Sequence, residues 1–268
     1  MKAQLIKGVF VVGGAVLFST LGIFASDALQ GIDGELHLGS VGKAKVCKEG
    51  SIFMQGPRGM LCVDQYEASP SPKCAFKNVA NVMQSEENLK SADCYAVSRK
   101  DVIPWNFISL PQAQRACAAT GKRLPTSEEW YRLALGTIET SCVVNESSVK
   151  VTGVSECTSA LGVYDAVGNV WEWVDAHVQG NNFDGRVLPG EGFVTSVDAN
   201  GVALSSGVSA DVLYGKDYFW SKQDGVFGVI RGGFYGSGDD AGIYTLNAAI
   251  ETSFATQGVG FRCVEDVL

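Results

Sequence analysis

The sequence of 268 residues predicts an α+β protein with two main helices, short irregular strands and an apolar helix at the N-terminus. Two capping boxes, each followed by apolar residues at helical spacing, predict the main helices. After residue 136 this spacing ends, and short apolar runs such as 227–230 and 259–264 alternate with turn residues. That pattern is typical of strands and loops, and the 32 glycines agree with it.

The boundaries of the two helices follow from capping boxes and glycine stops: Ser109 and Gln112 before Gly121, then Thr126 and Glu129 before Gly136. Glu128 and Glu129 fall in the first turn of the second helix, where the helix dipole favours negative charge. We interpret them as features of the helix start, because adjacent helical residues do not face one site.

The N-terminal segment predicts export. Lys2 and Lys7 precede an uncharged run of 19 residues (8–26) that Asp27 ends, close to the ~20 residues that span a bilayer. We expect residues 1–28 to be a signal anchor in the cytoplasmic membrane or a cleaved signal peptide, and a prepilin-like leader cut after Gly8 is a further alternative. Residues 29–46 then form a stalk and residues 47–268 a globular domain at the cell surface.

The number of cysteines and the net charge restrict the cross-links and the partners that we expect. Eight cysteines in an exported chain predict disulfides, although spacing alone leaves 105 possible pairings. The net charge of −8 and the lack of a basic cluster argue against a nucleic-acid partner.

Seven short motifs occur in one order along residues 47–268: CVDQYEA (62–68), PW (104–105), AC (116–117), GKRLPTSEEW (121–130), GVYDAVGNVWEW (162–173), RGG (231–233) and GFRC (260–263). As an ordered set they resemble the formylglycine-generating-enzyme family, also called the sulfatase-modifying-factor domain. The resemblance implies a C-type-lectin-like fold.

The resemblance also implies one disulfide. In the family, a cysteine of the first helix pairs with the cysteine of the closing GFRC motif, here Cys117 with Cys263. We expect the other six cysteines to pair locally, as Cys47–Cys62, Cys74–Cys94 and Cys142–Cys157.

The family's catalytic metal ligands are missing from this chain. The enzymes hold Cu(I) with two cysteines after the RGG motif, and the matching positions are Ser237 and Gly242. Thiolates are the soft ligands that Cu(I) prefers, so we expect no copper and no enzymatic activity. A branch of the superfamily uses iron held by three histidines, whereas this chain has only His37 and His177.

A structural calcium ion is a further expectation from the resemblance. The family's GNxWEW turn surrounds calcium, and the matching ligands are the side chains of Asp165 and Glu172 and the carbonyls of Gly168 and Val170. The alternative is that the two carboxylates bind backbone amides.

The segment 234–257 stands where the family has its active site, and its mixture of Tyr, Ser, Gly, Asp and Asn is typical of binding surfaces. It resembles the variable segment of diversity-generating-retroelement target proteins, which implies a ligand face. The alternative is an ordinary glycine-rich loop. Residues 218–220 are expected to border the face, and these residues are expected to line it: Phe234, Tyr235, Ser237, Asp239, Asp240, Tyr244 and Asn247.

Together these observations predict an exported, membrane-tethered, non-catalytic protein that binds a protein or glycan through residues 234–257. One alternative is a structural subunit of a surface filament or envelope, self-assembled through the N-terminal helix. A second is an oxidoreductase of the formylglycine-generating type with an altered site.

Overall fold

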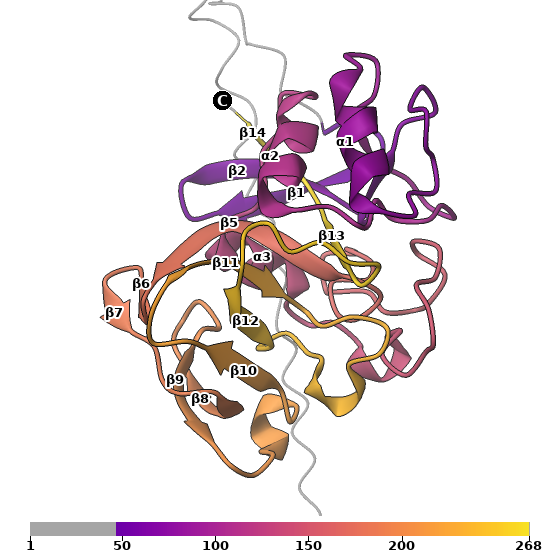
Figure 1. Cartoon of the computed structure of the whole chain (residues 1–268). Coiled ribbons are helices and arrows are strands. Elements are labelled where there is room, and N and C mark those ends of the chain that lie inside the picture. The colour runs from indigo at the N-terminus through magenta and orange to yellow at the C-terminus, as the bar shows by residue number, and fades with distance from the viewer. Residues whose placement is uncertain (1–46, 268) are drawn as a thin grey trace, which may run out of the picture. The chain divides into compact units, whose positions relative to one another are not determined.

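The computed structural model describes residues 47–267, and the elements of this part are shown in Figure 1. The expected signal or anchor segment (1–28), the stalk (29–46) and His37 lie outside the described residues. Within residues 47–267, no helix has the length and apolar character needed to cross a bilayer.

A large mixed sheet forms the lower half of the domain in Figure 1, with the strand order β7-β6-β5-β11-β12-β10-β8-β9. A ninth strand, β13, pairs with β5 in parallel, whereas β5 pairs with β11 antiparallel. The predicted runs 227–230 and 259–264 fall in β11 and in β13 with β14, as expected. The strands are β5 (Trp171–Gln179), β6 (Asn182–Phe183), β7 (Arg186–Val187), β8 (Gly192–Val197), β9 (Ala203–Gly207), β10 (Tyr218–Ser221), β11 (Val226–Arg231), β12 (Leu246–Ile250) and β13 (Val259–Phe261).

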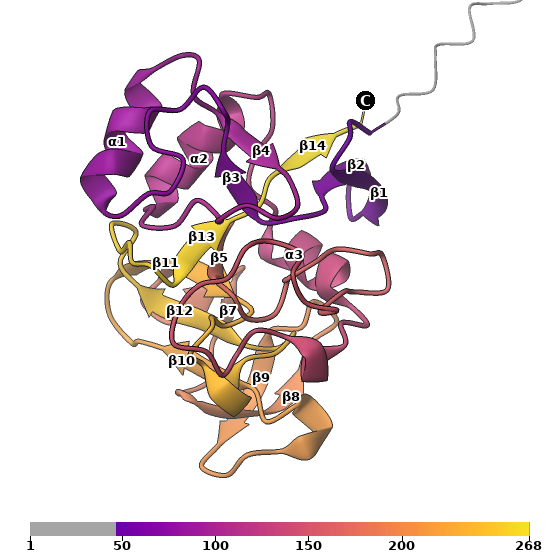
Figure 2. The same cartoon turned by 90° about the vertical axis from the view of Figure 1, so that its right-hand side faces the viewer.

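Two smaller sheets lie at the other end of the domain (Figure 2). One has the order β1-β2-β14 and brings the last strand of the domain against its first two, and the other is the β3–β4 ribbon. The strands are β1 (Ser51–Gly56), β2 (Gly59–Asp64), β3 (Ala68–Pro70), β4 (Ala96–Ser98) and β14 (Val264–Asp266).

Residues 47–267 contain three α-helices, so the expectation of two main helices is corrected: α1 (Val82–Lys90), α2 (Leu110–Ala118) and α3 (Ser127–Ala134). Both predicted capping boxes are confirmed, at the starts of α2 and α3. Helix α1 was not predicted because the residues that it buries are Ser85 and Asn88, which give no apolar period. Three short 3-10 turns complete the elements of the described part of the chain: η1 (Glu139–Ser141), η2 (Val212–Tyr214) and η3 (Gly238–Asp240).

Strand β5 lies between two hydrophobic clusters. Its Trp173 packs in the cluster with Trp105 and Phe261, whereas the next residue, Val174, packs in the cluster with Trp130. Successive side chains of a strand point to opposite faces, so one strand fills both cores. The GNVWEW motif therefore places its side chains at the centre of the fold.

All eight cysteines form disulfides, and the pairs are the four expected ones: Cys47–Cys62, Cys74–Cys94, Cys117–Cys263 and Cys142–Cys157. Disulfides form and persist in oxidising compartments. The chain is therefore suited to an extracellular or otherwise oxidising environment.

Candidate functional site

An aromatic cavity of about 260 Å³ opens where residues 234–257 meet β5 and β11. Three of the expected face residues line it, Phe234, Tyr235 and Asn247. Four further lining residues lie in the same segment but were not named from the sequence: Ile250, Phe254, Thr256 and Gln257. The other four come from outside this segment, namely Trp171 in β5, Ile230 in β11, and Gly258 and Val259 directly after it. The cavity thus combines apolar walls with a few amide and hydroxyl groups, which is typical of ligand pockets.

Aromatic rings hold the shape of this cavity. Trp171 contacts Trp220 edge to face at a centroid distance of 5.7 Å, and Trp220 contacts Tyr218 at 4.6 Å. Phe234 and Tyr235 pack edge to face at 5.0 Å. Of the three residues expected to border the face, Tyr218 and Trp220 join this aromatic group, whereas Phe219 is buried in the core.

The RGG motif shapes the turn that carries Phe234. Gly232 and Gly233 both have a positive φ, of +91° and +84°, which glycine adopts without strain. A Cβ at position 232 would overlap the carbonyl oxygen of Ala166. Ser237 Oγ then accepts the backbone N–H of Phe234 at 3.0 Å, so this hydroxyl holds the turn.

The other expected face residues do not line the cavity. Asp239 and Asp240 lie in η3, where Asp239 forms an ion pair with Lys216 at 2.8 Å. Tyr244 packs between Tyr131 and Tyr214, at centroid distances of 5.9 and 5.6 Å. Burial and the neighbouring Tyr131 raise the pKa of Tyr244 to about 12, so its hydroxyl stays neutral at physiological pH.

At the two positions that match the family's copper ligands, neighbouring groups of the protein occupy the space beside the residue. Ser237 is engaged with the backbone of Phe234, and the Asp217 carboxylate lies against the Cα of Gly242. A Cβ built on Gly242 would overlap all three atoms of that carboxylate group. Since position 242 has no room for a thiolate, these residues do not fit a copper ion.

Asp217 lies beside the expected ligand face, and no sequence pattern singled it out. It is buried, its Oδ2 accepts the N–H of Tyr244 at 2.7 Å, and its Oδ1 has no hydrogen-bond partner within residues 47–267. Burial and the nearby Glu139 raise the pKa of Asp217 well above its usual range. Glu139 accepts the N–H of Ile243, so two carboxylates together fix the backbone of residues 242–244.

The expected calcium ligands already have protein partners. Glu172 is fully buried, pairs with the buried guanidinium of Arg262, and accepts Trp130 Nε1–H at 2.7 Å. Asp165 accepts the N–H of Gly153 at 2.6 Å and the hydroxyl of Ser155 at 3.2 Å. This arrangement does not fit a calcium ion held by both carboxylates, and calcium at Asp165, Gly168, Val170 and Glu172 stays a prediction from the resemblance.

A third buried carboxylate completes this network. Glu67 accepts Asn169 Nδ2–H at 2.6 Å and the N–H of Val170 at 3.2 Å. Burial, followed by the charges of Asp165 and Glu172, raises the pKa of Glu67 well above its usual range. The CVDQYEA and GNVWEW motifs therefore meet in one hydrogen-bonded cluster that braces the turn before β5.

Comparisons with known proteins find similarity over part of the chain. Residues 144–267 match the sulfatase-modifying factor enzyme 1-like domain. A relative, the inactive C-alpha-formylglycine-generating enzyme 2 of Bos taurus, is 29% identical over 129 residues, covering 39% of this chain and 43% of the relative. The chain thus spans less than half the length of that protein.

Two solved structures are also similar. The Major Tropism Determinant I1 variant covers 82% of this chain, with 53% of its own length matched, at a TM-score of 0.47 and 17% identity. PvdO from Pseudomonas aeruginosa covers 81% of this chain, with 92% of its own length matched, at a TM-score of 0.45 and 14% identity. The match over residues 144–267 confirms the resemblance to the formylglycine-generating-enzyme family that the ordered motifs indicated.

Proposed function

We propose that this protein is a non-catalytic binding protein whose ligand contacts the face of residues 234–257, centred on the aromatic cavity. One observation carries the proposal: the Asp217 carboxylate occupies the space that a ligand side chain at position 242 would need, while an aromatic cavity stays open on the same segment. The segment that matches the family's active-site region therefore lines an open cavity but lacks the two copper-binding thiolates.

Two further observations support this proposal. The matched relatives of Bos taurus and Mus musculus are both named inactive enzymes. The cavity also joins four aromatic rings to the side-chain amides of Asn247 and Gln257; the rings are those of Trp171, Phe234, Tyr235 and Phe254. Rigid rings with adaptable polar groups supply contact area at low cost in conformational entropy.

We further propose that the protein is displayed at the cell surface and tethered to the membrane by residues 1–28. Four disulfides support an oxidising location, and the apolar run after Lys7 supports the tether. The filament alternative depends on the same run, which lies outside the described residues.

Catalysis is tested with the full-length protein in mild detergent, a cysteine-containing peptide, Cu(I) and oxygen. We expect no oxidised peptide above the level with free copper, and no stoichiometric Cu(I) binding. Turnover that depends on the protein would overturn the non-catalytic assignment.

Binding is tested by selecting phage-displayed peptides on the immobilised full-length protein. The Phe254→Ala variant serves as the matched decoy, because Phe254 lines the cavity and is 39% exposed, so its loss has little effect on the core. We expect enriched peptides to bind the decoy at least about tenfold more weakly. Peptides that bind both proteins equally would show that the cavity is not the binding face.

A further inference from the structure

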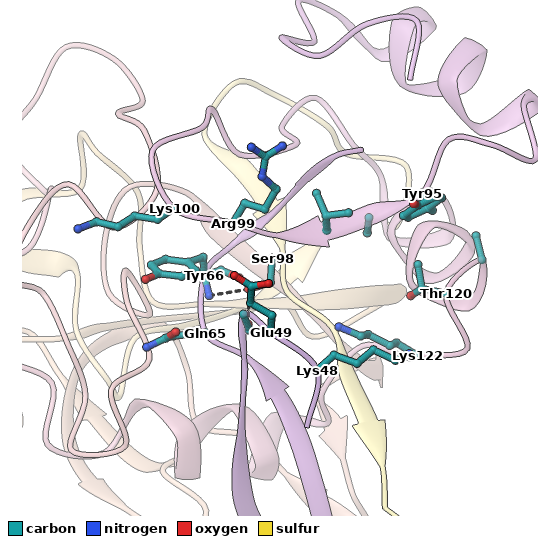
Figure 3. Close-up of a pocket in the computed structure, with 14 residues that line it drawn as sticks. Lys48, Glu49, Gln65, Tyr66, Tyr95, Ser98, Arg99, Lys100, Thr120 and Lys122 are labelled. Atoms are coloured by element: carbon teal, nitrogen blue, oxygen red, sulfur yellow. Dashed lines mark hydrogen bonds between the residues drawn. The ribbon is translucent and has the colours of Figure 1, made fainter. Parts of the chain in front are cut away.

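A second cavity, of about 790 Å³, is lined by four basic side chains and one acidic side chain. Figure 3 shows them around the β3–β4 ribbon and the end of α2. The charged residues are Lys48, Glu49, Arg99, Lys100 and Lys122. The whole chain has a net charge of −8, so this concentration of cations is a local reversal of the protein's charge.

Two of the four cations pair with carboxylates, and the other two have no ion-pair partner in the described part of the chain. Lys122 forms an ion pair with the buried carboxylate of Asp64, and Lys48 pairs with Glu265 at 3.5 Å. Arg99 and Lys100 are exposed and form no ion pair within residues 47–267. Arginine in particular binds carboxylate, sulfate or phosphate groups through two parallel hydrogen bonds.

Three further polar groups of the same cavity have no hydrogen-bond partner in the described part of the chain. They are the hydroxyls of Tyr66 and Tyr95 and the carboxylate of Glu49. In Figure 3 the Glu49 carboxylate lies between the Lys100–Tyr66 side of the cavity and its Lys48–Lys122 side. The cavity therefore offers hydrogen-bond acceptors and phenolic rings together with cations.

The floor of this cavity is held in place before any ligand binds. Tyr66 stacks on Tyr164 with ring centroids 5.0 Å apart and an interplanar angle of 20°. Ser98 Oγ accepts the N–H of Tyr66 at 3.0 Å and donates to the carbonyl of Gly50 at 2.6 Å. A preformed site loses less conformational entropy on binding.

We propose that this cavity binds an acidic oligosaccharide, with its carboxylate or sulfate groups on Arg99 and Lys100 and its hydroxyls donating to Glu49. A simple anion would be repelled by Glu49, and an acidic peptide brings few hydroxyl donors for that carboxylate. The lining includes no exposed large apolar side chain, so an apolar ligand gains little here. The volume falls within the range of about 300–1,000 Å³ typical of small-molecule sites.

This site is separate from the aromatic cavity, because the two share no lining residue. Binding of an acidic glycan here does not depend on the ligand face proposed above. Each proposal can therefore fail without affecting the other.

The test measures fluorescence anisotropy of labelled hexasaccharides with the full-length protein in mild detergent. One probe alternates uronic acid with N-acetylhexosamine, a second is its sulfated form, and a third is a neutral hexasaccharide of equal length. We expect the acidic probes to bind and the neutral one not to bind. The Arg99→Gln/Lys100→Gln variant is expected to bind at least about tenfold more weakly.

The matched control is Arg132→Gln/Lys222→Gln, which removes two exposed positive charges outside the cavity. We expect its affinity for the acidic probes to equal that of the unmodified protein. An equal loss in the control would mean that only net charge matters, and that result would overturn the site.

The Glu49→Gln variant distinguishes glycan binding from the binding of a simple anion. If hydroxyls donate to Glu49, this change weakens binding of the acidic hexasaccharides, because a charged acceptor becomes neutral. A labelled poly-glutamate peptide is the comparison, and we expect it to bind more weakly than the glycans. Tighter glycan binding by Glu49→Gln, or equal binding of poly-glutamate, would overturn the oligosaccharide assignment. The relative affinity of the uronic and sulfated probes identifies the source of the anionic group.

Discussion

The carboxylate of Asp217 packs directly against the Cα of Gly242, in the space that any side chain at position 242 would occupy. Gly242→Ala is therefore expected to destabilise the fold by about 1–3 kcal/mol through overpacking. Thermal unfolding measures the loss, and Gly190→Ala is the matched control because nothing lies within 4 Å of a Cβ there.

A companion change tests whether Asp217 is the cause. Asp217→Ser shortens the side chain and keeps an acceptor for the N–H of Tyr244. In a double-mutant cycle we expect Gly242→Ala to cost less in the Asp217→Ser background than alone. Additive effects would show that another contact limits position 242.

Replacing Asp217 by Asn is expected to change the pH dependence of stability. Burial and Glu139 raise the pKa of Asp217 in the folded protein, so folding favours its protonated form. This contribution is present below the unfolded pKa of about 3.9 and is lost as the pH rises toward the folded pKa. The unmodified protein should therefore lose stability above pH ~4 relative to Asp217→Asn.

Melting temperatures between pH 4 and pH 8 measure this difference. Each unit of pKa elevation corresponds to about 1.4 kcal/mol, or roughly 3–5 °C for a domain of this size. Asp224→Asn, at an exposed position before β11, is the control and should follow the unmodified protein. If the melting temperatures of Asp217→Asn and the unmodified protein change with pH in the same way, ionisation of Asp217 does not affect stability.

The buried pair of Glu172 and Arg262 predicts a large effect for Glu172→Gln. Both side chains are fully buried, so the change leaves the guanidinium without its main counter-charge. Breaking such a pair typically costs about 3–5 kcal/mol. Glu128→Gln breaks the partly exposed pair with Arg132 and should cost less than about 1 kcal/mol. Chemical denaturation of both variants measures the loss in free energy of unfolding. Equal losses would contradict the large effect expected for the buried pair.

The calcium prediction is tested by metal removal. Because Glu172 is committed to Arg262, and Asp165 to Gly153 and Ser155, we expect EDTA to leave the melting temperature unchanged. A melting temperature that rises with added calcium, and does not rise with magnesium, would restore the calcium site implied by the resemblance.

The sequence predicted those elements whose signals are local. Helices α2 and α3 were found because side-chain caps and glycine stops lie within a few residues of each helix. Helix α1 was missed because Ser85 and Asn88 are buried through hydrogen bonds, Ser85 with Trp105 and Asn88 with Phe76. These partners lie outside the helix, so the contacts leave no periodic apolar pattern in the helix sequence.

The candidate site was predicted only where one segment supplies it. Phe234, Tyr235 and Asn247 belong to the segment singled out in the sequence, whereas Trp171 and Ile230 reach the cavity through the pairing of β5 with β11. Asp217 lies 25 residues before Gly242 and has no local signal at all. Contacts of this kind depend on the sheet order, which apolar runs do not specify.

The contact between β14 and β2, together with the disulfide Cys117–Cys263, has a consequence for how the chain matures. The first sheet of the domain acquires its third strand only from residues 264–266, and the long covalent link closes only when residue 263 is present. A chain synthesised from its N-terminus therefore cannot complete this end of the domain until residues 263–266 are present. A nascent chain interrupted before residue 263 would lack the partner of Cys117 and would carry that cysteine without its native disulfide.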